Sequence, residues 1–198
     1  MNIQKISKIR NKGKIFVLSS PSGGGKTTLA QQLLETTSNM VRSISMTTRA
    51  PRNGEQDKID YHFVTNKEFL DLVKKDGFLE YANVFDQYYG TPKAFVEKNQ
   101  NKGKDILLLI DVQGAEQIRR HCREAILIFI MPPSMSVLQD RLKNRSTDTD
   151  HEIKKRLEVA KDEISQAKLY DYIVINSNLK QAEKDLKAII TAERLKNK

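Results

Sequence analysis

The feature that most constrains this chain is a glycine-rich turn between an apolar strand and a helix. Residues 15–19 read Ile-Phe-Val-Leu-Ser, residues 20–27 read Ser-Pro-Ser-Gly-Gly-Gly-Lys-Thr, and good helix formers follow. This context is typical of a phosphate-binding loop. Glycines allow consecutive main-chain N–H groups to turn toward an anion, and the helix N-terminus adds further unpaired N–H groups. Lys26 is expected to reach the outer phosphates, and the Thr27 hydroxyl to bind Mg²⁺.

The loop departs from the strict G-x-x-x-x-G-K-[ST] pattern at one position, because Ser20 replaces the first glycine. That glycine makes the turn out of the strand, and another small residue can make the same turn. The alternative is a glycine-rich hairpin with an incidental lysine. The apolar strand before the turn and the helix after it favour the phosphate loop.

The bulk composition indicates one α/β domain that handles anions. The chain has 198 residues, 38% hydrophobic and 30% charged, with a net charge of +9. This charge fits either nucleic-acid binding or the handling of polyanionic small molecules such as nucleotides. Aromatic residues do not alternate with the basic ones as a stacking platform requires, so the small-molecule interpretation is preferred and no specific nucleic-acid partner is expected. RNA binding through the basic surface stays open as an addition to catalysis.

Cysteine, histidine and hydropathy patterns exclude several classes of protein. Cys122 is the only cysteine and cannot form an internal disulfide. The three histidines have no metal-ligand spacing with it, so a structural zinc is not expected. No long apolar segment or signal peptide is recognisable, so we expect a cytoplasmic protein without a membrane partner.

Alternating strands and helices predict the fold class. Four apolar runs predict buried strands at 15–19, 106–110, 125–131 and 172–175. Helical patterns occupy 27–36, 92–102, 114–122, 134–144, 152–168 and 179–195. This order predicts an α/β fold in which a parallel sheet has helices on both faces. Ligands of such sheets bind at the carboxyl ends of the strands, where both the glycine-rich loop and Asp111 lie.

Two segments break this alternation. Residues 40–91 contain short alternating pieces and predict a small, partly antiparallel insertion, and the polar stretch 144–151 lies between arginine-bearing helices like a mobile lid. We therefore expect a single domain covering 1–198. Its parts are a core of 14–39, 92–140 and 157–190, an insertion of about 40–91, and a lid of about 141–156.

Several side chains outside the loop are candidates for phosphate and metal binding. Asp111 follows an apolar strand and is expected to hold Mg²⁺ through water, with a helix cap as the alternative. Arg49 and Arg52 flank a stiffening proline and could each present a planar fork to a phosphate. Arg141, Arg145 and Arg156 surround the lid segment and could neutralise charge during phosphoryl transfer. The alternative for all five arginines is an ordinary solvated surface.

Glu80 is the candidate for reading a base. Guanine presents two N–H donors on one edge, which a carboxylate accepts as a matched pair, whereas adenine presents one donor and one acceptor. A buried mismatch costs about 1–3 kcal/mol, which is enough for strong discrimination.

Taken in order, these motifs resemble those of the guanylate kinase family of nucleoside monophosphate kinases. The resemblance runs from about residue 14 to residue 182. It depends most on the segment Thr-Thr-Arg-Ala-Pro-Arg-Asn-Gly-Glu at 47–55 with Asp-Tyr-His-Phe at 60–63, and also on Tyr-Tyr-Gly-Thr at 88–91 and Asp-Val-Gln-Gly at 111–114.

The resemblance implies a P-loop kinase fold with a GMP-binding insertion and a helical lid. It implies transfer of the γ-phosphate of ATP to GMP, giving ADP and GDP, in purine metabolism and GMP recycling. Mg²⁺ would act with ATP, held by Thr27 and, through water, by Asp111. The catalytic residues would be Lys26, Arg49, Arg141, Arg145 and Arg156. The ATP-binding residues would be Ser20, Pro21, Ser22, Gly23, Gly24, Gly25, Lys26, Thr27, Thr28 and Asn176. The GMP-binding residues would be Ser45, Arg49, Arg52, Tyr61, Glu80, Tyr89, Thr91 and Asp111.

Some alternatives and departures stay open at this stage. The same fold also serves as a non-catalytic phosphopeptide-binding module, another monophosphate could be the acceptor, dGMP is a further candidate, and the chain could be a monomer or a small homo-oligomer. Lys58 and Ser146 replace glycines of the family pattern, and Leu109 stands where an acidic residue is frequent.

Overall fold

The computed structural model describes residues 12–84, 86–144 and 149–196. The chain divides into two compact units. One is built chiefly from Asn39–Leu108 and Gln113–Ala125, and the other from Phe16–Ser38, Leu109–Val112 and Ile126–Lys198. We call them the insertion unit and the phosphate-loop unit and describe each by itself.

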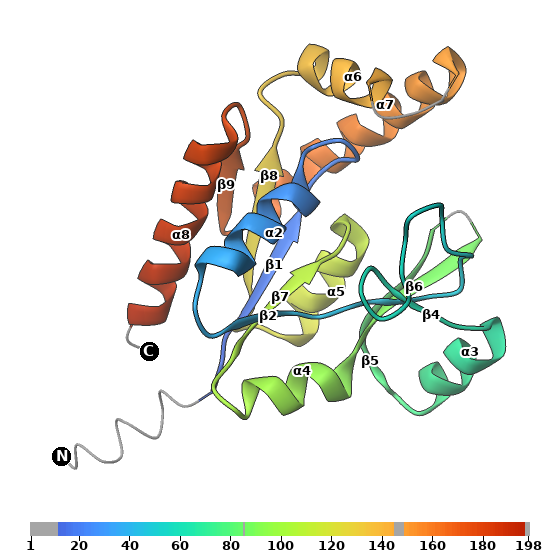
Figure 1. Ribbon diagram of the computed structural model, residues 1–198, viewed down its shortest axis with the longest axis vertical. Helices are drawn as coiled ribbons and strands as arrows, with labels where there is room; N and C mark the ends of the chain where they lie inside the picture. Colours follow the sequence, from blue (N-terminus) through green and yellow to red (C-terminus); the bar gives the residue numbers. More distant parts are fainter. Residues whose placement is uncertain (1–11, 85, 145–148, 197–198) are drawn as a thin grey trace. The chain divides into compact units, whose positions relative to one another are not determined.

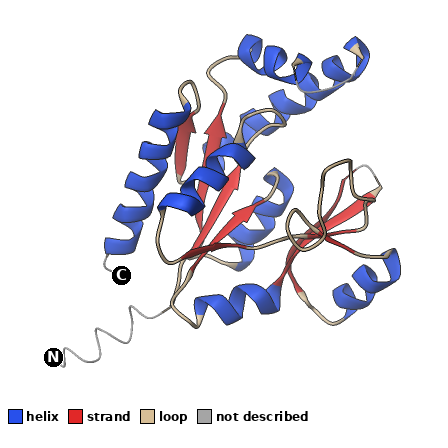
Figure 2. Ribbon diagram, viewed as in Figure 1, coloured by secondary structure: helices blue, strands red, loops and turns tan. Residues whose placement is uncertain are grey.

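The larger sheet has five parallel strands in the order β2-β7-β1-β8-β9 (Figures 1 and 2). They are β1 (Ile15–Ser19), β2 (Met40–Arg42), β7 (Asp105–Leu109), β8 (Ile126–Met131) and β9 (Tyr172–Ile175). Every residue of β1 is buried, as are the first five of β8. Continuous apolar strands of this kind suit a parallel sheet that is covered on both faces. The predicted parallel sheet flanked by helices is confirmed.

The helices of the phosphate-loop unit are α2 (Lys26–Thr36), α6 (Met135–Lys143), α7 (Asp150–Ser165) with the 3₁₀ turn Gln166–Leu169, and α8 (Leu179–Leu195). The helix α8 runs beside α2 (Figure 1). Both helices bury leucines of their apolar stripes, as expected for amphipathic helices on a sheet. The helices α6 and α7 share a smaller apolar cluster, made of Leu138, Leu142, Ile153 and Ala160.

The insertion unit contains a separate four-stranded sheet in the order β4-β3-β6-β5. Its strands are β3 (Met46–Thr47), β4 (His62–Phe63), β5 (Phe78–Val84) and β6 (Gln87–Pro92). The strand β3 pairs parallel with β4 and antiparallel with β6, so the sheet is mixed, as predicted. The helices in this part of the chain are α3 (Asn66–Lys74), α4 (Lys93–Gln100) and α5 (Val112–His121).

An aromatic core holds the small sheet to α3. The ring of Phe69 is fully buried and stacks on Phe78 at 4.3 Å and on Tyr88 at 5.2 Å between centroids. A capping box starts α3, in which the Thr65 hydroxyl accepts from the Glu68 N–H and the Glu68 carboxylate accepts from the Thr65 N–H. These contacts give the insertion unit its own apolar centre.

Most element boundaries agree with the sequence analysis, with three informative differences. The strand β2 has three residues, too few for a periodic pattern, and was not predicted. The helix α3 falls in the stretch where only short alternating pieces were expected. The helix α7 starts two residues before the predicted 152, because Thr149 and Glu152 form a second capping box at its N-terminus. No described helix is both long and apolar enough to cross a bilayer.

Candidate active site

The glycine-rich loop adopts the conformation that its sequence requires. Gly23 and Gly25 have φ of 87° and 92°, in the left-handed region that other residues rarely adopt. A Cβ added to Gly25 would collide with the side-chain amide nitrogen of Asn176, which donates to the main-chain oxygen of Gly24 at 2.9 Å. Asn176 is only 4% exposed. The sharp turn and the close approach of Asn176 therefore both depend on glycine.

The cationic and hydroxyl groups of the loop lie at the start of α2. The Lys26 Nζ donates to the main-chain oxygen of Ile110 at 2.8 Å, at the carboxyl end of β7. Thr27 and Thr28 are exposed in the first turn of the helix. The N-terminal N–H groups of α2, its dipole and Lys26 all favour an anion at this point.

Two carboxylates face this cationic end of the loop. Asp111 lies two residues after the end of β7, and its main-chain oxygen accepts from the Ser19 hydroxyl at 3.4 Å. Glu163, on α7, is close enough to Lys26 and Asp111 for their charges to affect its pKa. Burial raises the pKa of Glu163 to about 7, and the charge of Asp111 acts in the same direction, while Lys26 opposes the rise. A carboxyl group that titrates near neutrality thus lies beside the loop.

Two of the three predicted lid arginines have defined partners in the same unit. The Arg156 Nη2 donates to the Ser22 hydroxyl at 2.6 Å. The Arg141 Nη2 donates to the main-chain oxygen of Asn176 at 2.9 Å, while its other terminal nitrogen, Nη1, is buried without a protein partner among the described residues. Arg145 lies outside the described residues.

A pocket of about 440 Å³ opens between the start of α2 and the loop after β9. Its walls include Gly23, Gly25, Thr28, Arg141, Asn176 and Leu179. The pocket brings the predicted ATP-binding Asn176 together with the phosphate loop.

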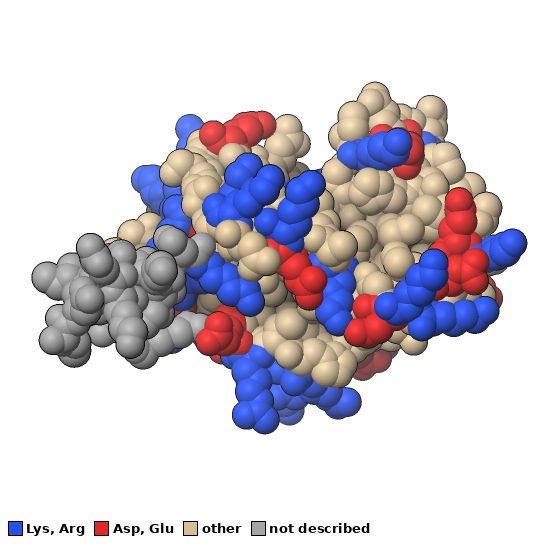
Figure 3. Space-filling model, turned by 90° about the horizontal axis from the view of Figure 1, so that it is seen from below, with Lys and Arg blue, Asp and Glu red and all other residues tan. Residues whose placement is uncertain are grey.

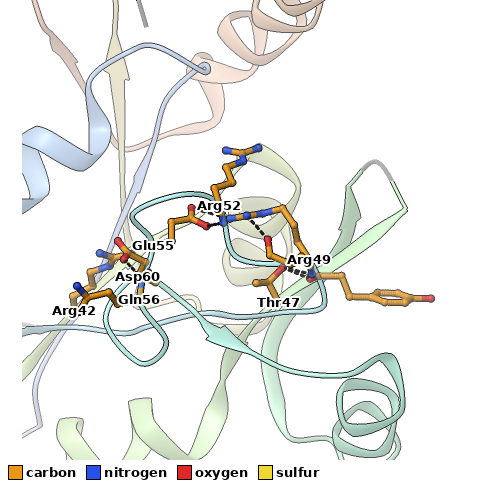
Figure 4. Close-up of polar contacts among 9 residues, drawn as sticks. Arg42, Thr47, Arg49, Arg52, Glu55, Gln56 and Asp60 are labelled. Carbon is orange, nitrogen blue, oxygen red and sulfur yellow. Dashed lines mark hydrogen bonds and ion pairs between the residues drawn. The ribbon is translucent and has the colours of Figure 1, made fainter. Parts of the chain in front are cut away.

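In the insertion unit, Arg49 is held by a carboxylate and by aromatic rings. Its Nη2 donates to Glu55 Oε1 at 2.9 Å, and its Nη1 donates to the main-chain oxygen of Ala50 at 2.7 Å (Figure 4). The guanidinium carbon lies 5.4 Å from the ring centroid of Tyr61 and 5.8 Å from that of Phe63. The Glu55 hydrogen bond raises the pKa of Arg49, and the same bond lowers the pKa of Glu55. Arg49 is therefore a fixed cation with a defined orientation.

Glu55 also organises the segment that carries the second arginine. Its Oε2 accepts from the main-chain N–H of Arg52 at 2.7 Å, so one carboxylate ties together both predicted phosphate-binding residues. The Arg52 side chain itself is exposed (Figure 4). A second polar group fixes the following turn, where the Gln56 N–H donates to Asp60 Oδ2 at 2.8 Å and the Arg42 Nη2 donates to the Asp60 main-chain oxygen at 3.1 Å.

The predicted tyrosines lie next to Arg49. The rings of Tyr61 and Tyr89 meet edge to face with centroids 6.0 Å apart. Burial raises the pKa of Tyr61, and the neighbouring Tyr89 raises it further. The Tyr61 hydroxyl therefore stays neutral and can donate a hydrogen bond. Tyr89 is also close enough to Arg49 to help raise the pKa of the arginine. Ser45, just before β3, is half-buried.

Glu80 and Thr91 form a buried pair across β5 and β6. The Thr91 hydroxyl donates to Glu80 Oε1 at 2.6 Å, and the two residues are 1% and 5% exposed respectively. From α5, the Gln117 side chain accepts from the Tyr81 N–H at 3.2 Å and donates to the Tyr81 oxygen at 2.7 Å. Gln117 thereby mimics a neighbouring strand at the edge strand β5, next to Glu80.

Three residues of this arrangement were not predicted from the sequence, namely Glu55, Gln117 and Glu163. Glu55 stands inside the quoted motif, and its spacing from the arginines was the only available signal. Gln117 and Glu163 lie in helical stretches among many polar residues, and nothing in a single sequence separates them from solvated neighbours.

Comparison with known proteins identifies the family. The guanylate kinase family model matches residues 12–193. A guanylate kinase of Rickettsia prowazekii is 50% identical over 190 residues, covering 96% of this chain and 96% of that protein. The chain belongs to the guanylate kinase family. Enzymes of this family transfer a phosphate from ATP to GMP, giving ADP and GDP, so the expected family and activity are confirmed.

Other members of the guanylate kinase family match over most of the chain as well. A guanylate kinase of Thermus thermophilus is 50% identical over 183 residues, covering 92% of this chain and 83% of that protein. The crystal structure of guanylate kinase from Anaplasma phagocytophilum superposes with a TM-score of 0.80 at 40% identity, covering 94% of this chain and 89% of that one.

The chain departs from the guanylate kinase sequence pattern at Lys58, Leu109 and Ser146, and the structure describes the first two of these positions. Lys58 replaces a glycine and has a φ of 64°, so this lysine adopts the left-handed conformation that a glycine would adopt freely. Leu109 ends β7 and is half-buried, and Ser146 lies outside the described residues.

Among the described residues, no three His, Cys, Asp or Glu side chains gather as a metal cluster. On the face in Figure 3, lysines and arginines are interspersed with acidic side chains.

Proposed function

We propose that this chain binds the triphosphate of ATP with its glycine-rich loop, holds GMP with the insertion unit, and transfers the γ-phosphate between them. The observation that carries this assignment is the buried Glu80–Thr91 pair, in the same unit as the arginine that Glu55 and two aromatic rings fix. A buried carboxylate and a fixed cation are the two groups that guanine and a monophosphate require.

The proposed ATP half of the reaction depends on main-chain donors and Lys26. The N–H groups from Gly23 to Thr27 would surround the β- and γ-phosphates, and Lys26 would exchange its contact with the Ile110 oxygen for the phosphates. The pocket beside Asn176 would hold the adenosine, and Thr28 would contact the phosphates from the first turn of α2. The buried, unpaired Nη1 of Arg141 supports an anionic or acceptor group of the nucleotide at this place.

The donors near the loop fit Mg²⁺. This cation prefers oxygen ligands, keeps several waters, and is commonly held by one or two protein groups together with substrate phosphates. The exposed Thr27 hydroxyl and the Asp111 carboxylate offer such donors. When bound, Mg²⁺ would neutralise phosphate charge.

The proposed GMP half divides between phosphate and base. Arg49 and Arg52 would bind the monophosphate as planar forks, assisted by the hydroxyls of Tyr61 and Tyr89. Glu80 would accept from the guanine edge, with Thr91 fixing its other oxygen and Ser45 supplying a hydroxyl. Asp111 would contact GMP as well as the water shell of the metal.

The chemical step needs positioning more than proton transfer. An oxygen of the GMP phosphate would attack the γ-phosphorus in line, the bond to the β-phosphate oxygen would break, and ADP would leave. Lys26 and Arg156 would neutralise the charge that spreads over the transferred group, with Arg141 and Arg145 in the same role. No covalent enzyme intermediate is required.

The test is ADP release with GMP, dGMP, AMP, UMP and CMP as acceptors, together with the variant Lys26→Ala. We expect GMP to be preferred, and we expect Lys26→Ala to lose most turnover while it still binds GMP in calorimetry. Equal rates with all acceptors, or normal turnover of Lys26→Ala, would contradict the proposal. A chain that binds phosphopeptides but releases no ADP would support the scaffold-module alternative instead.

A further inference from the structure

A half-buried arginine ties the strand β2 to the turn that precedes Tyr61. Arg42 is the last residue of β2, and its side chain reaches the turn at 56–60 within the insertion unit (Figure 4). The Arg42 Nη2 donates to the main-chain oxygen of Asp60 at 3.1 Å. The Arg42 Nε is buried without a protein partner among the residues that the structure describes. Burying an arginine donor unpaired is unfavourable for stability, so an arginine at this position calls for another explanation.

The turn at 56–60 closes on itself through Asp60. The Asp60 N–H donates to the Gln56 oxygen at 3.0 Å, and Asp60 Oδ2 accepts from the Gln56 N–H at 2.8 Å. The Asp60 main-chain oxygen, by contrast, accepts from outside the turn, from Arg42. Lys58 lies inside the same turn with a φ of 64°, a left-handed conformation that is strained for a residue with a Cβ. An exposed turn that contains a strained residue needs support from outside, and Arg42 supplies such a contact.

The residue that follows this contact is Tyr61, a predicted ligand of the GMP phosphate. Its ring meets that of Tyr89 edge to face at 6.0 Å between centroids, and the guanidinium carbon of Arg49 lies 5.4 Å from its centroid. Burial raises the pKa of Tyr61, and the positive charges of Arg49 and Arg42 oppose this rise. Because the Asp60 carbonyl belongs to the peptide group that enters Tyr61, a shift of this carbonyl moves the phenol relative to Arg49.

We propose that Arg42 is a positioning residue for GMP phosphate binding, because its hold on the Asp60 oxygen fixes the Tyr61 hydroxyl beside Arg49. Arg42 acts through the turn and does not itself touch the nucleotide. This inference rests on the proposed function of the insertion unit as the GMP site.

A double-mutant cycle tests whether Arg42 acts through the Tyr61 hydroxyl. Arg42→Met removes the guanidinium donors and keeps an unbranched side chain. Tyr61→Phe removes the hydroxyl that is to be positioned and keeps the ring. Arg123→Met is the matched control, because Arg123 is exposed in the same unit and its loss changes the net charge equally. Circular dichroism and thermal unfolding check that every variant is folded.

The readout is the KM for GMP at saturating ATP, with KM for ATP and kcat measured alongside. We expect Arg42→Met to raise KM for GMP about fivefold, with kcat and KM for ATP within about twofold of the wild type. Arg123→Met should match the wild type in all three constants. In the Tyr61→Phe background, Arg42→Met should raise KM for GMP by less than about twofold, because no hydroxyl remains to be positioned.

A second substitution keeps the test decisive if Arg42→Met folds poorly. Arg42→Gln retains a polar side chain but is too short to keep the contact with the Asp60 oxygen. It should therefore show the same rise in KM for GMP, and the same loss of this effect in the Tyr61→Phe background.

Three results would overturn the inference. KM for GMP could stay normal in both Arg42 variants, its rise could persist in full in the Tyr61→Phe background, or KM for ATP could rise by the same factor. The second result would mean that Arg42 acts on GMP by its charge or by direct contact. A failure of the proposed function looks different, because the wild type itself would then release no ADP with GMP, and the inference would fall with it.

Discussion

Gly25 allows the physical account of the loop to be tested by a pair of matched substitutions. Gly25 and Gly54 both have left-handed backbones, with φ of 92° and 86°. A Cβ at Gly54 meets nothing within 4 Å, whereas a Cβ at Gly25 collides with the amide of Asn176. Gly54→Ala therefore measures backbone strain alone, and Gly25→Ala measures the same strain plus the loss of the Asn176 contact.

The expected magnitudes differ accordingly. Left-handed strain costs about 1–2 kcal/mol for a residue with a Cβ. Displacing Asn176 breaks its buried hydrogen bond to the Gly24 oxygen, which adds about 1–3 kcal/mol. We expect Gly54→Ala to lower Tm by about 2–8 °C and Gly25→Ala by about 4–20 °C, at roughly 2–4 °C for each kcal/mol in a chain of this size.

Thermal unfolding and ATP titration complete this test. Gly25→Ala should weaken ATP binding by about tenfold or more, because the shifted turn no longer directs its N–H groups at the phosphates, and Gly54→Ala should leave ATP binding unchanged. Equal losses of Tm in the two variants, with normal ATP binding by Gly25→Ala, would refute the reasoning about the loop.

Three further predictions address the insertion unit. Lys58→Gly should raise Tm by about 1–4 °C, because it removes left-handed strain at a φ of 64° against a smaller entropic cost in the unfolded chain; an unchanged or lower Tm would contradict this. Arg49 lowers the pKa of Glu55 from its ordinary 4.5, so the stabilisation that this ion pair provides is present above pH 4.5 and is lost as the pH falls through the lowered value. The stability advantage of the wild type over Glu55→Gln should therefore shrink in acid unfolding titrations, and a gap that widens toward low pH would be inconsistent with the pair. Gln117→Ala frees the edge of β5 beside Glu80 and should raise KM for GMP by about threefold or more, with KM for ATP unchanged, whereas the exposed Gln113→Ala on the same helix should change neither.

Much of the larger sheet could be predicted because its signals are local. The runs at 15–19 and 172–175 coincide with β1 and β9, and the alternation of strands and helices leaves few topologies open. The loop could be predicted for the same reason, since the strand, the glycines and Lys26 are contiguous in the chain.

The remaining parts depend on contacts between distant residues. Glu80 becomes buried only when β5 pairs with β6 and Thr91 lies opposite, and Gln117 is selected by its distance from Tyr81 in space, 36 residues away in sequence. Arg156 contacts Ser22, which is 134 residues away in sequence. A single sequence contains no signal for such pairings, although it does place Arg49 and Glu55 in one motif.

The most direct test of the central claim is the ratio of GMP to AMP turnover in the wild type and in Glu80→Gln. A glutamine amide turns a donor toward the two guanine donors, which costs about 1–3 kcal/mol in a buried site. We predict a wild type that strongly prefers GMP and a variant that loses at least about tenfold of this preference, with KM for ATP unaffected. An unchanged ratio would contradict the claim that Glu80 reads guanine.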